Sequence, residues 1–373
     1  MVLYSIQALL PTLARVFATS PAGASLVLSS TTAALALSLP AVGLLSDRIG
    51  RRPVMLVSLG ATSTLGLASA FAPTLPMLLA VRTLIGFALG GITAVAMAHL
   101  SEEVEPRSLG SAMGIYISGN TIGGLSGRLL VSVLEPWAGW HGALAAVGVV
   151  ALAATAVFWR LLPPTRHFVP AARPLRALLR AIREQFADPV LARLFGLGAV
   201  LMGSFVTVYN YVGFRLTAPP YRWSSAAVGW IFLVYLVGTF SSSWMGRLAD
   251  QRGRAPVLTA GLVLMLVGIA LSLAAPVPLL VFGVAVFTFG FFGAHATASA
   301  WVGRRAQTAT GLASSLYLLL YYLGSSAGGT TGGVLWSRLG WPGVTGMVAG
   351  LAGIGLLLAR DLARRTGQAP GPG

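Results

Sequence analysis

The charged side chains that could do chemistry in this sequence gather in two short segments of the same design. In each segment an aspartate is followed four residues later by an arginine. The residues concerned are Asp47, Arg48, Arg51, Asp250 and Arg254. A carboxylate at a helix end can face the positive N-terminus of a neighbouring helix and accept charge-assisted hydrogen bonds, which favours one helix arrangement. The chain has no cysteine, and the sequence contains no metal-ligand cluster, nucleophile–base pair or phosphate-binding loop. We therefore expect no enzyme, no cofactor and no metal.

Reversible proton binding is a second chemistry, and few groups could perform it. The nine acidic residues all fall in loops or near the ends of apolar runs. The candidates that lie deeper are His295, His99 and Arg82, and an ionisable group inside a membrane is a functional candidate by default. For each histidine the alternative is a neutral ring bonded to the helix backbone. Arg82 could anchor an anion, modulate a proton site or extend to the membrane surface. Arg128 could pair with Glu135, two turns further on the same helix face, as a periplasmic gate, but we expect it to extend to the surface instead.

The segments that must position these groups are strongly apolar. Of 373 residues, 56% are hydrophobic and 9% charged, and the mean hydropathy is +0.81, which excludes an ordinary soluble enzyme. A bilayer core needs about 20 helical residues per crossing. The sequence predicts an all-α membrane protein with twelve spans: 3–18, 24–46, 53–72, 75–99, 109–134, 140–162, 190–214, 224–246, 256–275, 277–302, 308–335 and 341–362. The first span is short, so either the native chain starts upstream of Met1 or this helix is truncated.

A long polar segment, residues 163–189, divides the twelve spans into two groups of six. We assign 1–162 to an N-terminal bundle, 163–189 to a cytoplasmic linker, and 190–373 to a C-terminal bundle with a short basic tail. The net charge of +16 comes from 25 arginines, and 19 of them fall on one side if the chain begins inside. The positive-inside rule then places both termini in the cytoplasm, with anionic lipid as a secondary partner of the linker. Because the arginines are spread between apolar runs, we expect no nucleic-acid partner.

The two halves repeat each other. The segment 43–53 matches 246–256 at an offset of 203 residues. A second match, at an offset of 205, joins two sets of glycines spaced every four residues, which form flat stripes for helix packing. These glycines are Gly119, Gly123 and Gly127, and Gly324, Gly328 and Gly332. A parallel repeat of this kind predicts a substrate site near the membrane midplane between the halves.

Residues 43–52 resemble the signature Gly-x-x-x-Asp-Arg-x-Gly-Arg-Arg of the major facilitator superfamily, and 246–254 resembles its degenerate second copy. The resemblance covers essentially the whole chain. Residues 119–124 are similar to the motif of the drug:proton antiporter branch, although Asn120 stands where that motif has proline. The resemblance implies that Asp47 caps a helix when the inside is closed. It also implies that Arg51 pairs with Glu102 or Glu103 as a conformational latch, and a solvated turn is the alternative.

The resemblance also implies which spans line the substrate cavity. Their polar and aromatic residues are Tyr4, Gln7, Tyr116, Asn120, Tyr209, Asn210, Tyr235, Tyr317 and Tyr321. Tyrosines and amides without a fixed acid suit neutral or amphipathic organic molecules, although some tyrosines could instead form interfacial belts. Asp250 and Arg254 imply a mirrored, looser latch, because no acid ends span 277–302.

The sequence thus predicts a secondary transporter of the bacterial inner membrane. We expect a monomer that exports a small organic molecule by alternating access in exchange for protons. The first alternative is a facilitator or an uptake symporter for a sugar or other neutral metabolite, which the thin supply of acids favours. The second alternative is a membrane receptor or scaffold that moves nothing.

Overall fold

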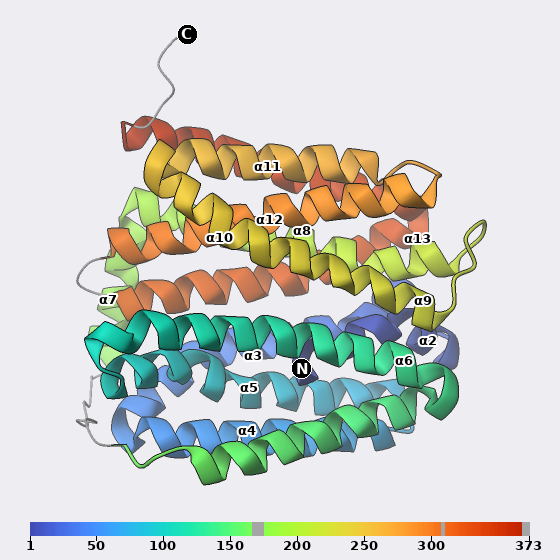
Figure 1. Ribbon diagram of the computed structural model, residues 1–373, viewed down its shortest axis with the longest axis horizontal. Coiled ribbons are helices and arrows are strands. Elements are labelled where there is room, and N and C mark those ends of the chain that lie inside the picture. The colour runs from blue at the N-terminus through green and yellow to red at the C-terminus, as the bar shows by residue number, and fades with distance from the viewer. Residues whose placement is uncertain (166–174, 307–309, 368–373) are drawn as a thin grey trace. The chain divides into compact units, whose positions relative to one another are not determined.

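The computed structural model describes residues 1–165, 175–306 and 310–367, and every regular element in these residues is a helix (Figure 1). The chain forms two compact units. The first comprises Met1–Leu178 and Leu216–Trp230, and the second comprises Leu179–Arg215 and Ile231–Gly373.

The first unit is built on four long helices and a short broken segment. The N-terminal segment is interrupted, because its α-helical ends flank a 3-10 turn at Ile6–Leu9. Proline lies in the first turn of four of the helices, where its missing N–H is no loss. The elements are α1 (Val2–Ser5), η1 (Ile6–Leu9), α2 (Leu10–Val16), α3 (Pro21–Ile49), α4 (Arg51–Ala68), η2 (Ser69–Phe71), α5 (Leu75–Glu103), α6 (Pro106–Leu161) and α9 (Ser225–Gly229).

The second unit repeats this order of long helices. The elements from the linker onward are α7 (Leu175–Ala187), α8 (Pro189–Thr217), η3 (Trp230–Val234), α10 (Tyr235–Arg252), α11 (Arg254–Leu271), α12 (Val277–Arg305) and α13 (Thr310–Arg365). The predicted linker 163–189 is therefore helical over Leu175–Ala187, and its residues 166–174 lie outside the described part of the chain.

The longest helices, α6 and α13, each contain two spans. Each has 56 residues and is broken by a glycine with positive φ, which is 65° at Gly139 and 64° at Gly340. Side chains with a Cβ rarely adopt this conformation, so glycine permits the bend. Nine helices in the described residues are long and apolar enough to cross a membrane. With two of them divided at these bends and the short apolar segment Val2–Val16 added, the predicted twelve-span fold is confirmed.

The sequence repeat is also a backbone repeat. Gly50 lies between α3 and α4 with φ 101° and ψ 156°, and Gly253 lies between α10 and α11 with φ 88° and ψ 154°. Both turns therefore need glycine, and both place an arginine in the first position of the helix that follows.

Candidate functional site: the arginine clusters of the two bundles

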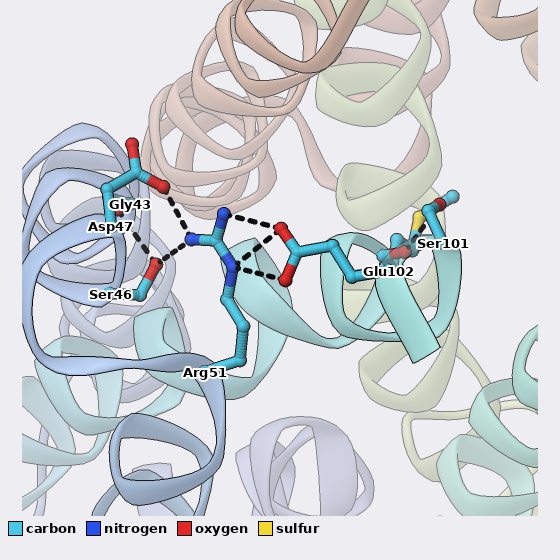
Figure 2. Close-up of polar contacts among 7 residues, drawn as sticks. Gly43, Ser46, Asp47, Arg51, Ser101 and Glu102 are labelled. Carbon is cyan, nitrogen blue, oxygen red and sulfur yellow. Dashed lines mark hydrogen bonds and ion pairs between the residues drawn. The ribbon is translucent and has the colours of Figure 1, made fainter. Parts of the chain in front are cut away.

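Arg51 links three helix ends in the first unit (Figure 2). Its Nη1 donates to Asp47 Oδ1 at 2.5 Å and to Ser46 Oγ at 2.6 Å, both in the last turn of α3. Its Nη2 donates to Glu102 Oε1 at 2.9 Å, at the end of α5. The guanidinium side chain is mostly buried, so the ends of α3, α4 and α5 are tied by charge-assisted hydrogen bonds.

The tight turn at Gly50 explains why Arg51 can reach both carboxylates. It starts α4 directly after α3 ends, so Asp47 and Arg51 face each other across the turn. Of the two acids suggested by sequence, the structure places Glu102 against Arg51. Arg48, at the end of α3, is exposed, and within the described residues it is not part of the Arg51 cluster.

The second unit has the same turn but different charge pairs. Asp250 accepts a hydrogen bond at 2.7 Å from Arg304, at the end of α12, and both side chains are more than half exposed. In the mirrored latch that the sequence predicts for Asp250 and Arg254, the described partner of Asp250 is therefore Arg304. The reason is that α12 ends in arginines where α5 ends in Glu102 and Glu103.

The neighbouring arginine of α12 binds the start of α8. Arg305 Nε donates to Asp188 Oδ2 at 2.8 Å, and Asp188 Oδ1 accepts from the backbone amides of Val190 and Leu191. Partial burial raises the pKa of Asp188, but these hydrogen bonds outweigh it and hold that pKa below its usual value. Asp188 thus caps α8 and joins it to the end of α12.

Arg82 is fully buried on α5, 1% exposed, and does not extend to the membrane surface. Its Nη1 donates to the Val2 carbonyl at 3.0 Å and its Nη2 to the Leu3 carbonyl at 2.6 Å. The carbonyls of the last turn of an α-helix lack intrahelical partners, and α1 ends at Ser5. The break in the first segment therefore supplies the acceptors that keep this guanidinium inside.

Arg128 on α6 is also buried, 2% exposed, so the expectation that it reaches the surface near Glu135 is wrong. Its Nε donates to Gln7 Oε1 at 2.9 Å, its Nη1 donates to the Gly124 carbonyl at 2.8 Å, and its guanidinium lies 4.6 Å from the centre of the Tyr4 ring. Glu135 instead accepts a hydrogen bond from Thr12. Sequence reasoning treated Arg128 as peripheral, although an arginine within an apolar run was the available signal.

The predicted cavity residues of the second unit join an aromatic cluster that includes His295. His295 Nδ1 lies 2.8 Å from the Tyr317 hydroxyl, and the centre of its ring lies 4.8 Å from that of the tilted Tyr321 ring. The Tyr209 hydroxyl lies 2.8 Å from Thr288 Oγ1, and the Tyr209 ring packs against Tyr235. Asn210 follows Tyr209 on α8 and is buried.

The remaining candidates lie on α5 and α6 of the first unit. Tyr116 packs against a hydrophobic cluster of α4 and α5, whereas Asn120 is exposed. His99 is buried near the end of α5, and its Nδ1 has no hydrogen-bond partner among the described residues.

The two glycine stripes differ in how closely another helix approaches them. A Cβ at Gly328 would meet the Gly203 carbonyl at 2.5 Å, one at Gly332 would meet Thr207 at 2.6 Å, and Gly324 lies against Ala199. In the first unit only Gly127 is crowded, Gly123 has ordinary contacts, and a Cβ at Gly119 meets no described atom within 4 Å. Among the described residues, the close packing expected of both stripes is therefore found along α13, against α8, and at Gly127 of α6.

These features are those of a multi-pass membrane protein: apolar helices in two repeated units, each with a glycine turn that presents an arginine. The chain belongs to the Major Facilitator Superfamily, whose sequence model matches residues 1–221 and 216–373.

Its relatives are bacterial transporters. The chain is 44% identical over 363 residues to the uncharacterized MFS-type transporter YybF of Bacillus subtilis, covering 97% of this chain and 90% of that protein. It is 45% identical over 363 residues to the inner membrane transport protein YnfM of Escherichia coli, covering 97% and 87%. The crystal structure of a D-xylose-proton symporter has the same fold, with a TM-score of 0.76 over 97% of this chain and 93% of that one at 16% identity.

Proposed function

We propose that this transporter exports small organic molecules across the bacterial inner membrane by alternating access, in exchange for protons. The observation that carries alternating access is the Arg51 cluster, which ties the ends of α3, α4 and α5 into one body. A bundle that is held together at its end can rock as a unit instead of deforming helix by helix.

Two features support export with proton exchange. The glycines of α6, including Gly119 and Gly123, resemble a motif of the drug:proton antiporter branch. His295, hydrogen-bonded to Tyr317, and His99 are titratable groups within apolar helices and are our candidates for carrying the proton. One charge that crosses 100 mV supplies about 2.3 kcal/mol, which is enough to drive accumulation.

An inner-membrane location is proposed because the relative YnfM is an inner membrane transport protein. The arginine distribution supports cytoplasmic termini, and the arginine-rich helix α7 supports contact with anionic lipid headgroups at that surface. We propose a monomer, because each unit contains its own charged cluster.

The test uses purified protein in sealed liposomes that contain a pH-sensitive dye and an acidic interior. Candidate drugs and metabolites are added outside, and protein-free liposomes serve as the control. Protein-dependent alkalinisation of the interior on adding a compound is the result expected for proton antiport. Labelled-compound flux without proton movement would contradict the exchange mechanism.

The second candidate function is a facilitator or an uptake symporter for a neutral metabolite. One observation favours this second function. The described carboxylates with assigned partners lie near helix ends and bind arginines or Thr12, as those of Asp47 and Asp250 bind arginines, so they are engaged outside the middle of the spans where a transported proton would be held. Movement of protons in the same direction as the compound, or flux with no proton movement, would select this alternative.

A further inference from the structure

The linker helix α7 exposes large apolar side chains. Leu179 is 57% exposed and Phe186 is 43% exposed. They are seven residues apart, about two helical turns, so they lie on the same face. The adjoining face is only partly exposed, through Ala181, Ile182 and Gln185. The helix α7 therefore packs along one side and presents two large apolar side chains on another.

The arginines of α7 lie beside these apolar side chains. Arg176, Arg180 and Arg183 are all exposed, and at 3.6 residues per turn they project within about 100° of Leu179 on one side of it. Arg180 Nε donates to Glu184 Oε1 at 2.9 Å, but the two side chains are 83% and 61% exposed, so this ion pair is weak and open to competition. Three arginines and one glutamate leave the helix with a net charge of +2.

The position of α7 in the chain places these side chains next to a membrane span. The helix ends at Ala187, and α8, which is long and apolar enough to cross a membrane, begins at Pro189. The Phe186 ring packs against Phe195 of α8, with the ring centres 5.3 Å apart. Asp188, between the two helices, caps α8. The C-terminal end of α7 is therefore held at the end of a span, where the headgroups of a bilayer begin.

A bilayer surface matches both kinds of side chain. Helices that lie in the membrane interface carry arginine or lysine on the polar face and leucine, phenylalanine or tryptophan on the apolar face. They bury the apolar face about 5–10 Å into the boundary between headgroups and acyl chains. The surface of an acidic soluble protein would match the arginines but not the exposed apolar pair beside them.

We propose that α7 is an interfacial membrane anchor. Leu179 and Phe186 insert among the acyl chains, and Arg176, Arg180 and Arg183 bind the phosphate groups of anionic lipids. This inference goes beyond the headgroup contact named under the proposed function, because it assigns apolar insertion to particular side chains. It rests on the proposed cytoplasmic position of the linker and not on transport.

The test uses single spin labels on the full-length protein, which contains no cysteine of its own. Leu179→Cys places the label on the apolar face of α7. Ala177→Cys is the matched control, because it is also exposed and lies about 160° around the same helix. The labelled proteins are reconstituted in phosphatidylcholine vesicles with increasing fractions of phosphatidylglycerol. Collisions of the label with oxygen, which concentrates in the bilayer, are compared with collisions with a water-soluble nickel complex.

With phosphatidylglycerol present, we expect the label at position 179 to collide mainly with oxygen and the label at position 177 mainly with the nickel complex. In pure phosphatidylcholine the label at position 179 should become accessible to the nickel complex. Equal nickel access at both positions would overturn the proposal, and so would oxygen access at position 179 that does not depend on phosphatidylglycerol. A label at position 179 that is shielded from both reagents would show that protein covers this face, which also overturns the proposal.

The arginines are tested by charge removal in the Leu179→Cys protein. Arg176→Gln combined with Arg183→Gln should raise the phosphatidylglycerol fraction needed for half-maximal insertion, because each arginine near an anionic surface favours binding by about fivefold. Arg338→Gln, at an exposed position of α13, should leave this fraction unchanged. An unchanged fraction in the double variant would overturn the assignment of the headgroup contacts to these arginines.

Insertion and transport are measured separately. Insertion is recorded in the resting protein without any cargo. Insertion of α7 in a protein that moves no compound would reject the proposed function and leave the anchor in place. Compound flux in a protein whose position 179 stays in water would leave the transport function and reject the anchor.

Discussion

The Arg51 cluster allows a quantitative prediction, because the chain contains a matched but exposed counterpart. Glu102→Gln keeps the side chain's shape but removes its charge. Hydrogen bonds to charged groups contribute about 1.5–3 kcal/mol and neutral ones about 0.5–1.5 kcal/mol. The side chains of Arg51 and Glu102 are 13% and 30% exposed, so water screens part of this difference. We expect a coupling free energy of about 1–2 kcal/mol between the two residues.

The counterpart is the pair of Asp250 and Arg304, whose side chains are 57% and 56% exposed at a distance of 2.7 Å. Exposed ion pairs contribute about 0–1 kcal/mol, so a coupling of no more than about 0.5 kcal/mol is expected there. The measurement is thermal unfolding of purified protein in two double-mutant cycles. One cycle combines Arg51→Gln with Glu102→Gln, and the other combines Arg304→Gln with Asp250→Asn.

Equal couplings in the two cycles would refute this reasoning, because burial and geometry are what distinguish the pairs. A transport measurement then tests the latch itself. Asp47→Asn removes one charge from the cluster and should lower flux while the protein stays folded. Unchanged flux at equal amounts of folded protein would leave the cluster with a structural role only.

Three further predictions concern separate parts of the chain. Gly328→Leu should prevent folding of the second unit, because the leucine side chain would collide with the Gly203 carbonyl. Gly119→Leu should give normal yield and a single peak in gel filtration. The opposite order would contradict the packing of the two glycine stripes. Asp188→Ala should lower stability at pH 7 by about 1 kcal/mol, the usual contribution of a helix cap. Folding lowers the pKa of Asp188, so the stabilising contribution of its carboxylate is complete above the unfolded pKa of about 3.9 and is lost as the pH falls through the folded value. The melting temperatures of the Asp188→Ala variant and the unmodified protein should therefore converge in acid. A difference that stays constant with pH would show that the charge of Asp188 does not contribute. His295→Phe keeps an aromatic ring near Tyr317 and Tyr321 but removes the titratable group. This variant should abolish the compound-driven alkalinisation of the liposome interior. Alkalinisation at the rate of the unmodified protein would assign proton transfer to another residue, such as His99.

The fold could be predicted from sequence because its signals are local and periodic. Apolar runs of about twenty residues identify membrane helices, and the two glycine-turn segments identify the repeat. The bends within α6 and α13, at Gly139 and Gly340, lie directly before the predicted spans 140–162 and 341–362. The interruption of the first segment at Ile6–Leu9 was not predicted, although Pro11, in the first turn of α2 directly after it, is the local signal for a break.

The charged sites were predictable only in part. Arg51 and its aspartate lie four residues apart, so their contact follows from local geometry, but the contact of Arg51 with Glu102 crosses 51 residues and depends on the packing and rotation of α5. The pairing of Asp250 with Arg304 crosses 54 residues and follows from the charge carried by the end of α12.

The sequence by itself determined the membrane class, the twelve spans, the repeat and the types of residue available for chemistry, because composition and spacing act over single helices. Only the tertiary structure decided that Arg82 and Arg128 are buried. A guanidinium stays in an apolar interior when carbonyls and amides are brought to it, and here these come from Val2, Leu3 and Gln7, which lie far away in the chain. The broken first segment supplies those groups, so the place where charge is held inside this protein is a property of its packing.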